Sequence, residues 1–276
     1  MRKNLRRGIY VIPTSFTVLN LFFGFRSIVW SIKGVEAVVQ DRIDLSIPFF
    51  EHACWALFIA AVFDTFDGMV ARKLGATSEF GKEYDSLADL LTFGAAPAVL
   101  IYCWGLRNLG GLGAGFAFLF LVAVSLRLAR FNVMTGKTDY RYFVGLPSPA
   151  GALTIASIVN YAPTPIGAGD RNFAIVMLVV TAAVAFSMVS PIRWRSQKGI
   201  NLQRQRSAMY FLMFAAVLAM AWMWTKEFFF IGAICYLTSG PLVRLWSIAF
   251  PSHASSPPAP PVHDEIHDEL APVEAP

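Results

Sequence analysis

The chain is organised as eight apolar segments separated by polar connections. The segments span about residues 10–32, 50–73, 86–105, 110–134, 146–163, 172–192, 207–225 and 227–249. A helix needs about 20 apolar residues to cross a bilayer, and these segments are continuously apolar rather than alternating, as a barrel strand would be. The pattern therefore predicts an all-α fold over residues 1–250, a polytopic membrane helix bundle with about eight transmembrane helices.

Positive charge is distributed unequally over the two ends of this bundle. Seventeen of the 23 Lys and Arg residues lie on the side of the N-terminus, and only five lie on the other side. Because basic residues favour cytoplasmic connections, we expect both termini in the cytoplasm and the chain in the cell (inner) membrane. This arrangement also explains the pI near 9.2, because the excess positive charge faces anionic lipid. The sequence predicts no nucleic-acid partner, since no basic stripe with interleaved aromatics stands outside these connections.

Composition argues against a soluble enzyme, a disordered protein and a disulfide scaffold. Apolar residues make up 56% of the chain and charged residues only 15%, against about 25% in a soluble domain. Cys54, Cys103 and Cys235 all lie in apolar segments, so we interpret them as small apolar residues and not as a disulfide framework. The four His residues lie in the C-terminal tail or at a segment edge. Chemistry within the membrane part must therefore use groups other than imidazole.

The last part of the chain has a different character. Residues 251–276 are rich in Pro, Ala and acidic residues, which is typical of a disordered tail, here expected in the cytoplasm. A repeated His-Asp-Glu leaves a weak metal-binding tract as the alternative interpretation.

Four carboxylates stand out because they lie at the cytoplasmic ends of the second and third predicted membrane helices. Asp64 and Asp67 end the second segment, and Asp85 and Asp89 begin the third, with a short connection that makes the two helices antiparallel neighbours. At about 100° per residue each pair shares one helix face, so all four can converge. Carboxylates at this depth are costly and repel one another. Oxygen ligands without His or Cys suit a hard cation, Mg²⁺ or Mn²⁺, and two ions would balance the charge.

The residues around this cluster fit a phosphate-containing substrate. Gly68 and Ala71 remove side-chain bulk beside the acids, Arg72 offers a planar donor fork, and Ser78 adds a hydroxyl group. Each has a plainer alternative: the small residues pack helices, and Arg72 marks the membrane edge.

The spacing of these residues resembles the signature of a known family. The stretch Asp64-x2-Asp67-Gly68-x2-Ala71-Arg72-x8-Gly81-x3-Asp85-x3-Asp89 is similar to that of the CDP-alcohol phosphatidyltransferases. Four further segments, PTSFTVLNLFFG, SLADLLTFGAAP, RLARFN and GLPSP, resemble the phosphatidylserine synthases of that family. Thr14 departs from the pattern, because related enzymes often carry Asn after the proline.

The resemblance implies a reaction, a set of ligands and an assembly. CDP-diacylglycerol and L-serine would give phosphatidylserine and CMP, in a chain that is expected to be a homodimer among membrane lipids. Asp64, Asp67 and Asp85 would hold one metal, and Asp64, Asp85 and Asp89 the second. Asp89 would also take the proton of the serine hydroxyl. The CDP group would be lined by Gly68, Ala71, Arg72, Ser78 and Gly81.

Weaker candidates and competing functions complete the prediction. Arg127 and Arg130, three residues apart at a helix end, would bind the lipid phosphate or the serine carboxylate, or only hold the helix end at the cytoplasmic face. The remaining candidates are Asn132, Thr17 and Asn20. The alternatives are another acceptor alcohol (glycerol phosphate, inositol phosphate or choline), a cation-coupled transporter, and a scaffold, which would leave the carboxylate cluster unexplained.

Overall fold

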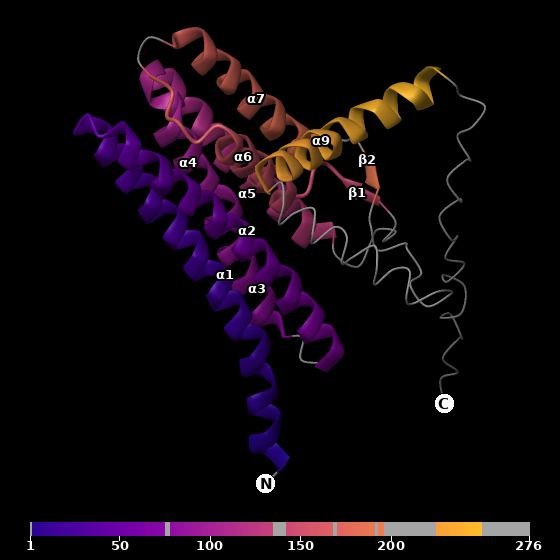
Figure 1. Cartoon of the computed structure of the whole chain (residues 1–276). Helices are drawn as coiled ribbons and strands as arrows, with labels where there is room; N and C mark the ends of the chain where they lie inside the picture. The colour runs from indigo at the N-terminus through magenta and orange to yellow at the C-terminus, as the bar shows by residue number, and fades with distance from the viewer. Residues whose placement is uncertain are drawn as a thin grey trace, which may run out of the picture.

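A computed structural model describes residues 2–74, 78–134, 142–167, 170–190, 193–195 and 225–249, with side chains described in 14–70, 78–133, 145–167, 170–190 and 226–242. Its long helices are α1 (Arg2–Val39), α2 (Ile43–Leu74), α3 (Glu79–Asp89), α4 (Ala96–Trp104), α5 (Gly111–Met134), α6 (Ser148–Tyr161), α7 (Arg171–Val189) and α9 (Thr225–Ala249). Figure 1 shows α1 and α2 as a long antiparallel pair, with α9 crossing the bundle near α6. The all-α prediction is confirmed.

The third predicted segment is one continuous helical rod with a π-helical turn inside it. Ser78 begins α3 by accepting a hydrogen bond on Oγ from the Gly81 N–H, at 3.0 Å, as an N-cap residue does. After Asp89 the π-helical turn η1 (Leu90–Ala95) leads directly into α4. A short 3₁₀ turn, η2 (Leu106–Leu109), then reverses the chain into α5.

Within the part of the chain that the structure describes, five helical stretches are long and apolar enough to span a membrane. They are Thr14–Val39, Ile43–Val70, Glu79–Trp104, Gly111–Val133 and Arg171–Val189, and each overlaps one of the predicted segments. The chain is thus a multi-pass membrane protein. Large apolar side chains such as Phe22, Phe118 and Phe186 are exposed on the outer faces, where lipid would cover them.

The predicted count of eight crossings is not confirmed. The segment expected at 146–163 forms α6, a helix of 14 residues, which is short of the about 20 needed to cross a bilayer. The segment expected at 227–249 forms α9, with Pro241 inside it, and it is not among the five spanning stretches. Almost all of the segment expected at 207–225 lies outside the described residues.

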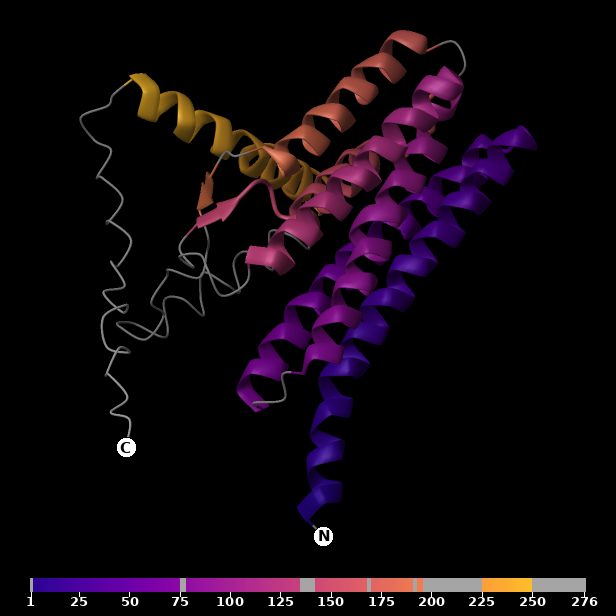
Figure 2. The ribbon, with the colours of Figure 1, turned by 180° about the vertical axis from the view of Figure 1, so that it is seen from behind.

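Two short strands occur where none was predicted. The strands β1 (Tyr142–Val144) and β2 (Arg193–Arg195) pair antiparallel, with Phe143 opposite Trp194. Both lie in polar connections outside the apolar segments, so the bilayer argument did not apply to them. The pairing joins two connections that the charge distribution places on the same side of the membrane, and Figure 2 shows it at the same end as the ends of α5 and α7.

The core is built where α2, α4, α5, α6 and α7 meet. Its largest fully buried side chains include Trp104, Phe50, Phe93 and Phe120. Trp104 also donates a hydrogen bond from Nε1 to the carbonyl oxygen of Ala162, at 3.0 Å. This core holds α2 and the α3–α4 rod together, and those are the elements that carry the four aspartates.

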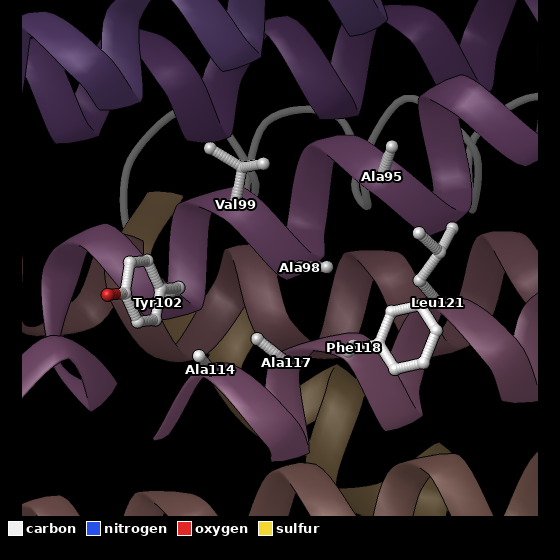
Figure 3. A pocket seen from close by; sticks show the side chains of 8 residues that line it. All are labelled: Ala95, Ala98, Val99, Tyr102, Ala114, Ala117, Phe118 and Leu121. Carbon is white, nitrogen blue, oxygen red and sulfur yellow. The ribbon is translucent and has the colours of Figure 1, made fainter. Parts of the chain in front are cut away.

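An apolar groove of about 240 Å³ lies on the outer side of the bundle between α4 and α5. Figure 3 shows the side chains that line it: Ala95, Ala98, Val99, Tyr102, Ala114, Ala117, Phe118 and Leu121. The four alanines leave the space, and the larger side chains border it. No titratable carboxylate or imidazole lines the groove, so it is separate from the acidic cluster.

Candidate active site

Three of the four aspartates meet at one point between α2 and α3. Asp64, Asp67 and Asp85 each offer a carboxylate oxygen, and these oxygens all lie within 4.8 Å of one another. Asp67 is 5% exposed, whereas Asp64 and Asp85 are half-buried. The prediction that α2 and α3 bring these carboxylates together is therefore confirmed by the geometry.

Asp89 extends the cluster by one helical turn beyond Asp85. Its carboxyl group interacts with that of Asp64, and the carboxyl groups of Asp67 and Asp85 interact in the same way. Two ionised carboxylates cannot approach so closely without a proton or a cation between them. Among the described residues no Lys or Arg forms an ion pair with any of the four.

The donor set fits a divalent cation. One carboxylate oxygen of Asp85, Oδ1, is buried and has no hydrogen-bond partner among the described residues. A buried carboxylate oxygen without a partner is costly, and a hard cation removes that cost by accepting it as a ligand. The acidic group Asp64, Asp67 and Asp85 can therefore hold a metal ion.

Helix α1 supplies polar contacts to this cluster. Thr17 donates a hydrogen bond from Oγ1 to Oδ2 of Asp67, at 3.2 Å. Asn20, one turn further along α1, donates from Nδ2 to Oδ1 of Asp89, also at 3.2 Å. Thr17 and Asn20 are both buried, so these two weaker candidates of the sequence lie directly against the aspartates.

The structure describes only some of the predicted CDP-binding residues with their side chains. Gly68 follows Asp67 on α2, and Gly81 lies in the first turn of α3 beside Ser78. The backbone of Ala71 and Arg72 is helical as part of α2, but their side chains lie outside the described residues.

The remaining candidates, which lie on α5, differ in burial and in their contacts. Arg127 is half-buried; its Nη1 donates to Oγ of Ser148 at 2.8 Å, and its guanidinium interacts electrostatically with Asp89. Its Nε is buried without a partner among the described residues. Arg130 is exposed. Asn132 is exposed too, and its Nδ2 donates to Ser86 Oγ at 3.0 Å.

Sequence reasoning missed three residues that contact these candidates, and a glycine that lies against one of the three. Ser148 binds Arg127, Ser86 binds Asn132, Thr92 donates to the backbone oxygen of Asn20, and Gly24 packs against Thr92. All four lie in segments whose resemblance was noted. Their roles were not visible, because each depends on a contact between segments far apart in the chain.

Comparisons with known proteins show which family and which relatives the chain is similar to. Residues 10–189 match the family model described as CDP-alcohol phosphatidyltransferase. The chain is 36% identical over 151 residues to a CDP-diacylglycerol–serine O-phosphatidyltransferase of Helicobacter pylori, an alignment that covers 55% of this chain and 58% of that protein. The aligned part is thus less than two thirds of the Helicobacter protein.

Two further relatives carry related names. A CDP-diacylglycerol–serine O-phosphatidyltransferase of Bacillus subtilis is 35% identical over 183 residues, with 66% of this chain and 89% of that protein covered. An archaetidylserine synthase of Methanothermobacter thermautotrophicus is 37% identical over 148 residues, with 53% and 56% covered. The matched range of the family model contains all four aspartates, and the chain belongs to the CDP-alcohol phosphatidyltransferase family.

Proposed function

We propose that the chain transfers the phosphatidyl group from CDP-diacylglycerol to L-serine, giving phosphatidylserine and CMP, as a step of phospholipid biosynthesis. One observation carries the proposal. In a membrane helix bundle, one carboxylate oxygen from each of Asp64, Asp67 and Asp85 lies within 4.8 Å of the others. The names of the relatives support serine as the acceptor.

The proposed cofactor is a pair of Mg²⁺ or Mn²⁺ ions. Asp64, Asp67 and Asp85 hold one ion in this proposal, and Asp64, Asp85 and Asp89 hold the other. Bound there, the ions would offset the negative charge of the pyrophosphate group of the substrate. The acid-only donor set supports hard cations over zinc or copper, which favour nitrogen and sulfur ligands.

The CDP group is proposed to lie over the α2–α3 connection. Gly68 and Ala71 leave room for it, Gly81 and Ser78 line it, and Arg72 donates to a phosphate oxygen. The location of Ser78 and Gly81 at the start of α3 supports this, since helix N-terminal N–H groups favour anions.

In the proposed transfer, Asp89 acts on the acceptor. The serine hydroxyl oxygen forms a bond to the lipid-bearing phosphorus while the bond between that phosphorus and the bridging oxygen breaks, so that CMP leaves. The hydroxyl proton passes to the Asp89 carboxylate as the new bond forms, because a free serine hydroxyl is far less acidic than a carboxyl group. The buried, histidine-free surroundings of the cluster support a carboxylate in this role.

Arg127 is proposed to receive the carboxylate of serine. Its half-buried guanidinium, held by Ser148 and close to Asp89, has a buried Nε without a partner among the described residues. An arginine fork matches a carboxylate. The exposure of Arg130 supports the alternative interpretation for that residue, namely holding the helix end at the membrane face.

Three further expectations stand as proposals. The active site and both termini face the cytoplasm in the cell (inner) membrane, residues 1–250 form the catalytic domain, and the chain is a homodimer. A second copy would find open space at Gly111 and Gly115 of α5, where an added Cβ meets no atom within 4 Å. Cysteine introduced at Gly115 should then cross-link two copies in membranes, whereas cysteine at the buried Ala123 should not.

A product assay with labelled CDP-diacylglycerol and a panel of alcohols tests the proposed function. Purified protein should release CMP and form labelled phosphatidylserine with L-serine, and should use glycerol phosphate, inositol phosphate and choline much more slowly. Product with another alcohol only would overturn serine as the acceptor. Absence of CMP release with every alcohol, together with cation flux in vesicles, would favour a transporter.

A further inference from the structure

Asn20 of α1 contacts both Asp89 and Thr92, a residue of the helical turn that follows Asp89. Thr92 donates a hydrogen bond from Oγ1 to the backbone oxygen of Asn20, at 3.3 Å. The side chain of the same Asn20 donates to Oδ1 of Asp89, at 3.2 Å. Asn20 thus contacts two residues of one helical rod, three positions apart, through its backbone and through its amide.

The two residues that form the hydrogen bond between Thr92 and Asn20 are shielded from solvent. Thr92 and Asn20 are both fully buried. The amide oxygen of Asn20, Oδ1, has no partner among the described residues. Among the described contacts, the side chain of Asn20 is therefore held through Nδ2 alone, and the bond from Thr92 is the second connection that fixes this residue against the rod.

The close approach of the two elements requires a glycine. A Cβ added at Gly24, one turn after Asn20 on α1, would meet Thr92 Oγ1 and lie 2.8 Å from Thr92 Cα. Real Cβ atoms essentially never come so close to a backbone atom. Gly24 therefore permits Thr92 to reach the backbone of α1.

The contact lies in the π-helical turn η1, which begins immediately after Asp89. Such turns are rare and are often found at functional sites. The wider turn changes the direction of the residues that follow Asp89, and here it accompanies the contact between Thr92 and α1.

We propose that Thr92 is a positioning residue for the transfer reaction, which fixes the backbone of α1 at Asn20 so that the Asn20 amide holds the Asp89 carboxylate toward the acceptor hydroxyl. The inference rests on the proposed function, because it assigns Asp89 to the acceptor. Hydrogen bonds to carboxylates from such supporting residues orient the reacting group.

The test compares Thr92→Val with Thr92→Ser. Valine keeps the shape of threonine but removes the donor, whereas serine keeps the donor. Thr92→Val should lower kcat about tenfold, as expected when one buried hydrogen bond is lost, with the KM and the binding affinity for CDP-diacylglycerol changed less than about twofold. Thr92→Ser should keep kcat within about twofold of the unmodified protein.

A matched control is available on α7. Thr181 is also fully buried, and its Oγ1 donates to the Met177 carbonyl of its own helix. Thr181→Val should therefore leave kcat within about twofold. If Thr181→Val slows turnover as much as Thr92→Val, or if Thr92→Ser is as slow as Thr92→Val, the assignment is overturned.

A double-mutant cycle shows whether Thr92 acts through Asn20. In an Asn20→Ala background, Thr92→Val should lower kcat by no more than about twofold, because the amide that it positions is gone. An undiminished tenfold effect in that background would contradict the proposal. CMP release with whichever alcohol the panel identifies serves as the readout, so the failure of serine as acceptor would overturn the proposed function and leave this test intact.

Discussion

Thr17 on α1 and Asp67 on α2 are joined by a hydrogen bond of 3.2 Å between Thr17 Oγ1 and Asp67 Oδ2, fifty residues apart in the chain. Asp67 is 5% exposed, so water cannot easily replace the hydroxyl. The same Asp67 carboxylate offers one oxygen to the cluster that it forms with Asp64 and Asp85. Helix α1, which carries none of the four aspartates, thereby takes part in the site.

Removal of this hydroxyl should weaken metal binding. Thr17→Val should raise the Mn²⁺ concentration needed for half-maximal turnover by about 10- to 100-fold, the range seen when a group that orients a metal ligand is lost. Thr17→Ser should restore most of the affinity. Thr154→Val is the control, because Thr154 is buried and its hydroxyl donates within its own helix. A normal Mn²⁺ requirement in Thr17→Val would show that the contact is structural only.

Metal removal should abolish activity reversibly. The four carboxylates repel one another without a cation, so a strong chelator should stop turnover, and Mg²⁺ or Mn²⁺ should restore it. Asp64→Asn and Asp85→Asn should each reduce turnover to background. Activity that persists in chelator, or a near-normal rate in either variant, would contradict the proposed ligands.

Asp89 should behave differently from Asp67. Asp89→Asn removes the basic oxygen but keeps the shape, so turnover should fall about 10²-fold or more, while CDP-diacylglycerol affinity should change much less. Asp67→Asn should damage affinity and rate together. A lipid-binding titration beside a turnover assay decides the matter. If the two variants lose affinity equally, Asp89 is chiefly a metal ligand.

Substitution of the two arginines of α5, Arg127 and Arg130, should affect the KM for serine differently. Arg127→Lys removes the fork that the structure holds against Ser148, so the KM for serine should rise about tenfold or more, with the KM for CDP-diacylglycerol changed less. Arg130→Lys is the matched control, since Arg130 lies one turn away and is exposed. Equal effects of the two substitutions would remove Arg127 from the acceptor site.

The C-terminal tail should be dispensable for catalysis. Residues 251–276 contain too few apolar side chains for a packed core, so truncation after Pro251 should leave turnover within about twofold. Turnover is to be measured on membrane-inserted protein at matched concentration. A large loss under these conditions would assign the tail a role in the reaction.

Much of the fold followed from local properties. The length of the apolar segments and their lack of alternation predicted membrane helices, because a bilayer leaves few ways to satisfy the backbone. Among the described residues, five of the predicted segments correspond to helices that are long and apolar enough to span a membrane. The helix α6 shows the limit of that argument: its residues are apolar enough, but it ends at Tyr161 after 14 residues. Hydropathy measures composition, and it does not tell whether an apolar helix faces lipid or other helices.

In the candidate site, too, the local spacing of residues was predictable from the sequence, and the contacts between distant segments were not. The spacing of Asp64, Asp67, Asp85 and Asp89 predicted their convergence from the sequence alone, because helical periodicity and a short connection act over a few residues. The contacts of Thr17 with Asp67, of Thr92 with Asn20 and of Arg127 with Ser148 were decided only by the tertiary structure. They join residues 21 to 72 positions apart, and such pairs form only when helix packing brings the two segments together. For Thr92 and Asn20 the missing side chain of Gly24 permits that close approach.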